Sequence, residues 1–315
     1  LTSISTYLLA REMGLKRSGC LISPILFLLS YNLIEYWGIG SYPNVTGLAF
    51  SPLALLMFCR AVKRRNLVNT LFAGLAYSVV VLTYFMNAMI VFVFIVVLSI
   101  LMVIREPSLM YVSRGPATPP KYTLVLPKVL FAMVLIAVAL SLWWALPFLI
   151  TYVTAPSIPG VPESGVPSAP RSLEGQLMAL LGVHPNIDSP GIGQFILAIT
   201  ACIVVFVKRK AEVADAPLCF LVAFIFCLAP WLRIPVGPVF WWRFTLYLSL
   251  FASICGGIIF DFMRGVYGKF LEENSLGKCL SKICLFSVIS LVLLGSIYPV
   301  VGSESTIFLG FDISQ

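Results

Sequence analysis

The stretch AMIVFVFIVVLSILMVIR, residues 88–105, decides the fold class, because its only charge is the final arginine. A transmembrane helix needs about 20 largely apolar residues to cross the hydrocarbon core of a bilayer. Backbone polar groups must find their partners within the segment there, and an α-helix provides them. The stretch therefore predicts a membrane-spanning helix.

The composition extends this prediction to the whole chain. Of 315 residues, 60% are hydrophobic and 11% are charged, and the mean hydropathy is +1.00. Soluble domains are about 45–50% apolar and about 25% charged. These values exclude an ordinary soluble domain and a disordered chain. They predict an all-α, polytopic transmembrane helical bundle.

Apolar segments of helical length recur along the chain, at 18–36, 47–60, 69–86, 88–105, 128–152, 193–207, 217–232, 240–260 and 283–301, after a partial segment at 1–10. They predict about nine full crossings and a partial one at the start. One transmembrane domain then covers 1–301, and 302–315 forms a tail on the outer face that opens an extracytoplasmic region. The sequence begins with Leu inside an apolar run, so we interpret it as a fragment of a longer protein.

The basic residues indicate the orientation. If every segment crosses, 18 of the 21 Lys and Arg residues fall on one side, and only Arg171, Arg233 and Arg243 fall on the other. The positive-inside rule makes the basic side cytoplasmic. The cytoplasmic loops are then 61–68, 106–127, 208–216 and 261–282. The net charge of +8 is thus explained by loops, and no nucleic-acid partner is expected.

Three local features refine this topology. The charge distribution favours a hairpin between 69–86 and 88–105, with Asn87 as the break. Ser51-Pro52 is typical of a helix start, which leaves 43–50 irregular and indicates a cavity near the outer leaflet. Ser253 and Gly257 have the small-residue spacing that close helix packing in lipid requires.

The tryptophans lie at predicted outer ends of segments: Trp37, Trp143, Trp144, Trp231, Trp241 and Trp242. An aromatic belt explains this placement, although belts normally line both interfaces. The alternative is an outer aromatic cavity for an apolar or sugar-bearing ligand. We predict that at least two of Trp143, Trp144, Trp241 and Trp242 line one outward cleft. The outer loop 153–192, which contains a predicted interfacial helix at 172–182, would cover it.

Few residues are candidates for chemistry. Arg243 lies within an apolar segment, where a charge needs a partner or water. It is interpreted as a ligand of a lipid-linked phosphate, with Arg233 as a second donor, or as a structural residue. In the structural interpretation its side chain extends to the lipid headgroups or pairs with Glu35. Glu35 is also open as a metal ligand or general base. The single histidine, His184, stands four residues before Asp188, a spacing at which the two side chains can share a metal or orient each other.

No metal site is assigned and no cofactor is predicted, with a divalent metal left open. The eight cysteines lie outside the predicted outer loops, at Cys20, Cys59, Cys202, Cys219, Cys227, Cys255, Cys279 and Cys284. They are interpreted as small packing residues.

Several motifs together resemble prokaryotic GT-C-type membrane glycosyltransferases and related membrane proteins described as 6-pyruvoyl-tetrahydropterin-synthase-related or YfhO-like. The resemblance rests on these stretches: LTSISTYLLAREMGLKRSGCLISPILFLLS (1–30), GIGSYPNVTGLAFSPLALLMF (38–58), LTYFMNA (82–88), WWALPFL (143–149) and WWRFTLYLSLFASICGG (241–257). It implies a GT-C-like fold and a transferase that uses a polyprenyl-phosphate-linked sugar at the outer leaflet.

The resemblance also implies partners and a location: membrane lipid and a lipid-linked sugar donor, in a prokaryotic plasma membrane. It carries Arg243 over as a ligand of the lipid phosphate, whereas Tyr84 stands where the family usually has a histidine. The family's catalytic carboxylate follows the first span, which precedes residue 1, so no catalytic residue is assigned. A transporter or flippase of an amphipathic solute, and a non-catalytic scaffold subunit, remain as alternatives.

Overall fold

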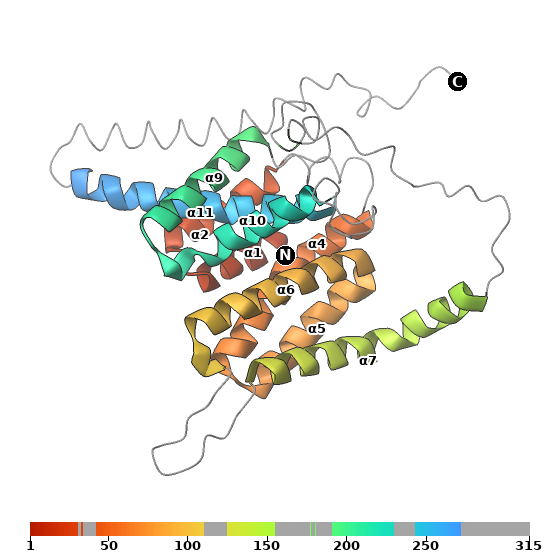
Figure 1. Cartoon of the computed structure of the whole chain (residues 1–315). Helices are drawn as coiled ribbons and strands as arrows, with labels where there is room; N and C mark the ends of the chain where they lie inside the picture. Colours follow the sequence, from red (N-terminus) through yellow and green to blue (C-terminus); the bar gives the residue numbers. More distant parts are fainter. Residues whose placement is uncertain are drawn as a thin grey trace, which may run out of the picture. The chain divides into compact units, whose positions relative to one another are not determined.

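A computed structural model describes residues 1–30, 33, 42–109, 125–154, 177, 180, 191–229 and 243–271. All the regular elements in this part of the chain are helices, which confirms the all-α prediction for it. The α-helices are α1 (Thr2–Glu12), α2 (Arg17–Leu28), α4 (Tyr42–Arg64), α5 (Leu67–Thr83), α6 (Phe85–Arg105), α7 (Val125–Thr154), α9 (Ile192–Val207), α10 (Asp215–Cys227) and α11 (Phe244–Leu271) (Figure 1). Two 3₁₀ turns, η1 (Pro107–Leu109) and η2 (Ala211–Val213), complete the set.

Four of these helices are long and apolar enough to cross a membrane: Tyr42–Arg64, Phe85–Arg105, Val125–Trp143 and Phe244–Val266. The helices α2, α5, α9 and α10 are apolar but shorter. The chain is thus an all-α membrane bundle, and the total of about nine crossings remains a prediction. Contacts divide the chain into two compact units, Leu1–Val45 with Pro170–Gln315 (unit 1) and Thr46–Ala169 (unit 2).

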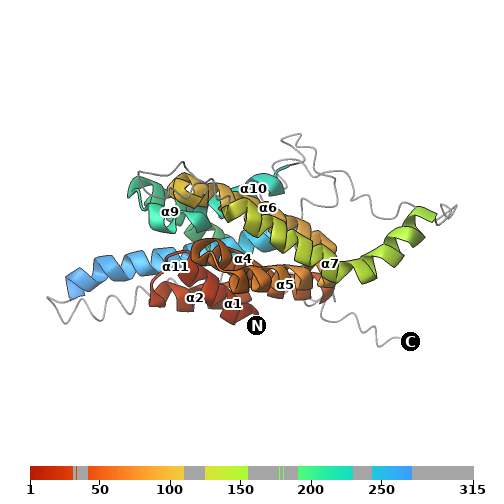
Figure 2. The same ribbon diagram turned by 90° about the horizontal axis from the view of Figure 1, so that it is seen from below.

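Unit 1 is built around α11, which contacts α1, α2, α9 and α10. Figure 2 shows α9 and α10 on one side of α11 and α1 and α2 on the other. From Arg243 to Gly257 every residue of this stretch is buried, as expected of a helix that is surrounded by others. The helix carries the core of the unit, including Tyr247 and Phe251.

The close packing of α2 against α11 depends on small residues. A Cβ atom added at Gly257 would lie 2.6 Å from the carbonyl oxygen of Gly19, and it would collide with the Ser23 hydroxyl. One added at Gly19 would lie 2.5 Å from the carbonyl oxygen of Gly257. Ser253, one turn earlier on α11, is fully buried. The predicted small-residue pair therefore lies in a tight helix–helix interface.

Unit 2 contains α5, α6 and α7, and α5 contacts both of the others. The hairpin of α5 and α6 is confirmed, but its break is at Tyr84 and not at Asn87. Tyr84 has an extended backbone (φ −162°, ψ 104°), whereas Asn87 is fully buried in the first turn of α6. The Tyr77 hydroxyl on α5 donates to the carbonyl of Ala88 on α6 over 3.1 Å, which fastens the hairpin.

The predicted irregular segment 43–50 is wrong, because α4 is continuous from Tyr42 to Arg64 with Pro52 inside it. Proline lacks a backbone N–H group, so a proline inside a helix leaves one carbonyl without its usual hydrogen bond. A helix tolerates this loss where neighbouring protein groups supply another partner. The Ser51 hydroxyl does not cap a helix start. It donates back to the carbonyl of Gly47 over 2.8 Å, so it lies within a helix that is already formed.

The predicted end of the last described span is also wrong. We expected a segment over 240–260 followed by a cytoplasmic loop from 261, but α11 continues to Leu271. Asp261 ends the apolar run without ending the helix, since its carboxylate is satisfied by another helix, as described below.

Candidate functional site

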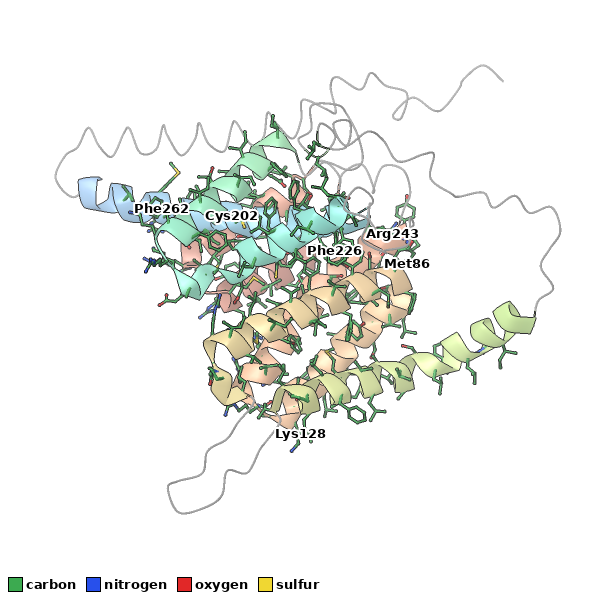
Figure 3. All side chains as sticks on the ribbon, in the orientation of Figure 1. Met86, Lys128, Cys202, Phe226, Arg243 and Phe262 are labelled. Atoms are coloured by element: carbon green, nitrogen blue, oxygen red, sulfur yellow. The ribbon has the colours of Figure 1, made fainter. Side chains whose placement is uncertain are left out.

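The predicted phosphate ligand, Arg243, lies directly before α11. Arg243 is 9% exposed, and Phe244 and Thr245 after it are 2% and 0% exposed. Phe244 stacks on Phe226 of α10, with ring centroids 4.5 Å apart and an interplanar angle of 10°. Figure 3 labels Phe226 and Arg243 among the side chains of unit 1. Aromatic stacking and burial thus stabilise the start of α11, next to the Arg243 guanidinium.

The electrostatics of this helix start favour an anion. The first turn of a helix presents backbone N–H groups and the positive end of the helix dipole. Arg243 adds a full positive charge with a forked array of donors. A buried cation is costly unless acceptors or an anion surround it. The start of α11 can therefore hold a phosphate or a carboxylate.

Unit 1 contains a buried amide that the sequence did not indicate. Gln194, near the start of α9, is fully buried, and its Nε2 donates to the carbonyl of Leu26 on α2. Its Oε1 has no hydrogen-bond partner in the described part of the chain. A buried, unpaired acceptor costs free energy unless water or a ligand supplies a donor. Glutamine in an apolar helix is a weak signal by itself, which is why it was overlooked.

The outer-cleft prediction stays a prediction. Trp143 is 72% exposed on α7, beside other exposed apolar residues such as Phe131 and Leu135, which is what a lipid-facing stripe or belt requires. The side chain of Trp144 is not described. The other predicted site residues lie outside the described residues: Glu35, His184, Asp188, Arg233, Trp241 and Trp242. The interfacial helix at 172–182 is described only at Leu177 and Leu180, which are both helical.

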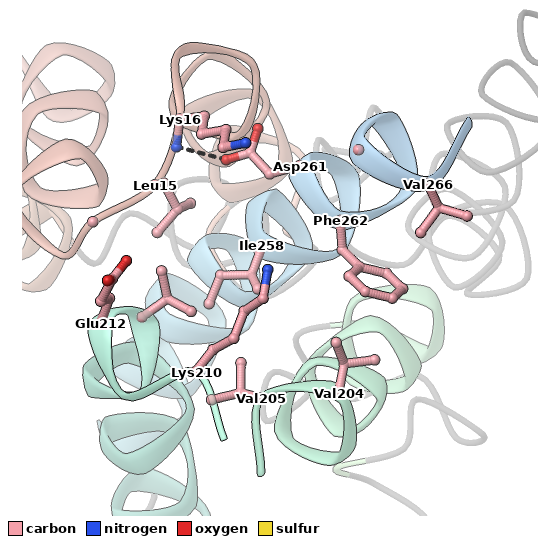
Figure 4. A pocket seen from close by; sticks show the side chains of 13 residues that line it. Leu15, Lys16, Val204, Val205, Lys210, Glu212, Ile258, Asp261, Phe262 and Val266 are labelled. Atoms are coloured by element: carbon pink, nitrogen blue, oxygen red, sulfur yellow. Dashed lines mark hydrogen bonds between the residues drawn. The ribbon is translucent and has the colours of Figure 1, made fainter. Parts of the chain in front are cut away.

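At the other end of the described α11, unit 1 contains a partly open cavity of about 320 Å³ (Figure 4). Three segments far apart in the sequence form its wall: the α1–α2 turn, the end of α9 with η2, and the last part of α11. The lining residues are Gly14, Leu15, Lys16, Val204, Val205, Lys210, Glu212, Val213, Ile258, Asp261, Phe262, Gly265 and Val266. We call it the Lys16–Lys210 cavity.

Asp261 organises one wall of this cavity. Its Oδ2 accepts from the backbone N–H of Lys16 over 2.7 Å, and its Oδ1 accepts from the Ser18 hydroxyl over 2.6 Å. The backbone N–H of Gly19 donates to the same Oδ1 over 2.8 Å. The carboxylate of α11 thus caps the start of α2, whose own N-cap residue makes no side-chain cap.

Two lysines give the cavity its cationic groups. The ammonium of Lys210 lies 5.9 Å from the centroid of the Phe262 ring, within reach of a cation–π contact. Neither Lys16 nor Lys210 forms a salt bridge to another described residue. The six free cysteines that the structure describes are all buried, in keeping with a packing role. Among the described residues, no group of three or more His, Cys, Asp or Glu is placed to hold a metal.

Sequence reasoning assigned most of these cavity residues to loops, and placed only Val204, Val205 and Ile258 in apolar segments. The charge pattern did provide one signal: Arg11, Lys16, Lys208, Lys210 and Arg264 were predicted to share a side. In unit 1 the segments 14–16, 204–213 and 258–266 do meet around one cavity. Which side of the membrane this end faces remains a prediction from the positive-inside rule.

The helices, their apolar lengths and the membrane-type packing define the chain as an integral membrane protein of the all-α class. Residues 1–298 match the family described as 6-pyruvoyl-tetrahydropterin synthase related domain, membrane protein, and the chain belongs to that family. No curated protein matches the chain. The family supports the membrane class and does not specify the GT-C group.

Proposed function

We propose that this protein is a membrane glycosyltransferase-like protein that handles a polyprenyl-phosphate-linked sugar at the outer leaflet, with Arg243 as a ligand of the lipid phosphate. The observation that carries the proposal is the burial of Arg243, a residue that is 9% exposed, at the start of α11. A guanidinium fork matches two phosphate oxygens, and the helix start adds further donors and positive potential.

The surroundings of Arg243 suit an amphipathic ligand. Phe226 and Phe244 form a stacked aromatic pair at the same helix start, next to which a prenyl chain or a sugar ring can pack. Arg233 would supply a second donor. The catalytic carboxylate, the sugar and the acceptor are not assigned.

The transporter alternative gains no support from α4. Transporters bind solutes at paired broken helices. The segment 43–50 was the single broken-helix candidate, and α4 is continuous through it. The remaining alternative, a non-catalytic scaffold, predicts no affinity for a lipid phosphate, which the following experiment measures.

The test compares binding of a polyprenyl phosphate and of the matching polyprenol to the purified protein in detergent. The wild-type protein should prefer the phosphate. Arg243→Ala should weaken phosphate binding by about tenfold to a hundredfold, because a hydrogen bond to a charged group contributes about 1.5–3 kcal/mol. Arg243→Lys keeps the charge but loses the fork, and should restore part of the affinity.

The rival explanation is a structural pair between Arg243 and Glu35, and thermal unfolding of the same variants separates the two. If the pair is the only role, Arg243→Ala and Glu35→Gln should lower the melting temperature to a similar extent. Phosphate binding in a folded Arg243→Ala protein that equals the wild type would refute the proposal. Weaker binding in Arg243→Ala, with Glu35→Gln unaffected, would support it.

A further inference from the structure

We propose that the Lys16–Lys210 cavity is a binding site for the headgroup of an anionic phospholipid, taken from the leaflet on the basic side of the membrane. This inference concerns the opposite end of unit 1 from Arg243 and does not depend on the proposed transferase function. The volume of about 320 Å³ lies within the range of about 300–1,000 Å³ that is usual for small-molecule sites.

The polar part of the lining combines two lysines with two acidic residues, and the two lysines can contact an anionic group. Lys16 and Lys210 come from different segments, and neither is neutralised by a salt bridge within the described residues. The lining also contains the carboxylates of Asp261 and Glu212, and the two Asp261 oxygens accept three hydrogen bonds from the start of α2. The two lysines, one in the α1–α2 turn and the other between α9 and η2, can each contact an oxygen of a phosphate diester. Figure 4 shows the Lys210 side chain turned toward Ile258 on α11.

The apolar half of the cavity points to a lipid and not to a soluble phosphate. Val204 and Val205 of α9, and Ile258 and Val266 of α11, line it. The apolar surface continues outward, since Val266 is 53% exposed and Val207 at the end of α9 is 72% exposed. In a membrane protein such exposed apolar surface contacts acyl chains. A headgroup in the cavity would leave its acyl chains on this surface.

Gly265 provides an independent reason to treat the cavity as a site. At Gly257 an added Cβ atom would collide with α2, so packing explains that glycine. At Gly265 an added Cβ atom would meet nothing within 4 Å, so packing within the described part of the chain does not explain it. Glycine inside a helix costs about 1 kcal/mol relative to alanine. An open cavity that admits a ligand beside Gly265 accounts for its presence.

The α1–α2 turn is in close contact with η2, which favours a preformed site. Gly14 has a φ of +89°, a conformation that residues with a side chain rarely adopt. Without a Cβ atom there, the carbonyl of Glu212 in η2 approaches the α1–α2 turn closely. This contact and the cap from Asp261 fix the positions of Lys16 and Glu212 at the cavity.

The experiment measures binding of phosphatidylglycerol, phosphatidylcholine and inorganic phosphate to the detergent-purified chain by native mass spectrometry. We expect retention of phosphatidylglycerol over phosphatidylcholine and no displacement by millimolar inorganic phosphate. Lys16→Gln and Lys210→Gln should each weaken phosphatidylglycerol binding by about fivefold, since a basic residue near anionic lipid contributes about 1 kcal/mol. Lys128→Gln, which removes an exposed lysine of unit 2, is the matched control and should not change binding.

A second variant fills the cavity without removing charge. Gly265→Phe places a ring in open space, so the protein should fold and keep its melting temperature while phosphatidylglycerol binding is lost. Equal binding of the two lipids, or binding that resists Gly265→Phe and both lysine variants, would overturn the proposal. Displacement by inorganic phosphate would show that the site recognises a free anion, which would also overturn it.

Discussion

The two parts of α11 are both helical, but their surroundings differ. From Arg243 to Gly257 the helix is buried on all sides, and its glycines are sites of close contact with α2. From Asp261 to Val266 it becomes partly exposed and forms the wall of the Lys16–Lys210 cavity. The first part contains a buried cation next to a helix start. The second part faces lysines that no described residue neutralises.

This comparison teaches how to interpret small and charged residues in an apolar helix. Gly257 and Gly265 are the same residue type eight positions apart, yet only the first is required by packing. The charged side chains of Asp261 and Lys210 differ in the same way. The Asp261 carboxylate accepts hydrogen bonds from the start of α2, whereas the Lys210 ammonium makes a cation–π contact with Phe262 and forms no salt bridge to a described residue. The surroundings, and not the residue type, decide which position is structural and which is available for a ligand.

The largest expected effect comes from filling the tight part of α11. Gly257→Leu should destabilise the protein by about 3 kcal/mol or more, because overpacking of a well-packed core costs about 1–3 kcal/mol and here the backbone of Gly19 is in the way. Thermal unfolding in detergent measures this loss. A Gly257→Leu protein that melts at the wild-type temperature would contradict the close contact between α2 and α11.

Removing the carboxylate at the boundary of the two parts should have an intermediate effect. Asp261→Ala should lower the free energy of unfolding by about 2 kcal/mol, since the variant loses a helix cap with charge-assisted hydrogen bonds. Asp261→Asn keeps an acceptor oxygen and should lose about half as much. Chemical denaturation of the three proteins provides the comparison, and no difference between Asp261→Ala and the wild type would show that the cap is dispensable.

The smallest effect, and one of opposite sign, is expected in the open part. Gly265→Ala should stabilise the protein by about 0.5–1 kcal/mol, because alanine restricts the unfolded chain and its methyl group meets no obstacle. The melting temperature should rise slightly while phosphatidylglycerol binding persists, as one methyl group fills little of the cavity. A fall in melting temperature would mean that Gly265 is packed as tightly as Gly257.

Much of the fold could be predicted from the sequence, because apolar length and charge segregation are local and additive signals. The ends of the helices were harder to predict from the sequence. Ser51-Pro52 has the local pattern of a helix start, yet α4 continues through it. Tyr84 interrupts the α5–α6 pair although an aromatic residue is no local stop signal, and Asn87 is buried instead. In both cases the surrounding packing overrides the local preference.

The cavity could not be predicted, for a different reason. Its wall joins residues near 15, 210 and 261, and no periodicity relates such distant positions. Asp261 was assigned to a loop because a charge ended the apolar run, but the donors that satisfy it belong to α2. Arg243 was identified from its unusual place in an apolar segment, and it is indeed buried. Its role in phosphate binding stays a proposal.

The cap that Asp261 places on α2 also has a consequence for biogenesis. The backbone donors of Lys16 and Gly19 are synthesised some 240 residues before their acceptor, since the Lys16–Asp261 bond spans 245 positions. A ribosome delivers the chain from its N-terminus, at about 5–20 residues per second. During synthesis, the start of α2 therefore lacks the Asp261 cap for many seconds. Its backbone N–H groups are accessible to water or chaperones during that interval. The arrival of α11 completes both the interface with α2 and the cap, so unit 1 closes only when its last described helix is inserted.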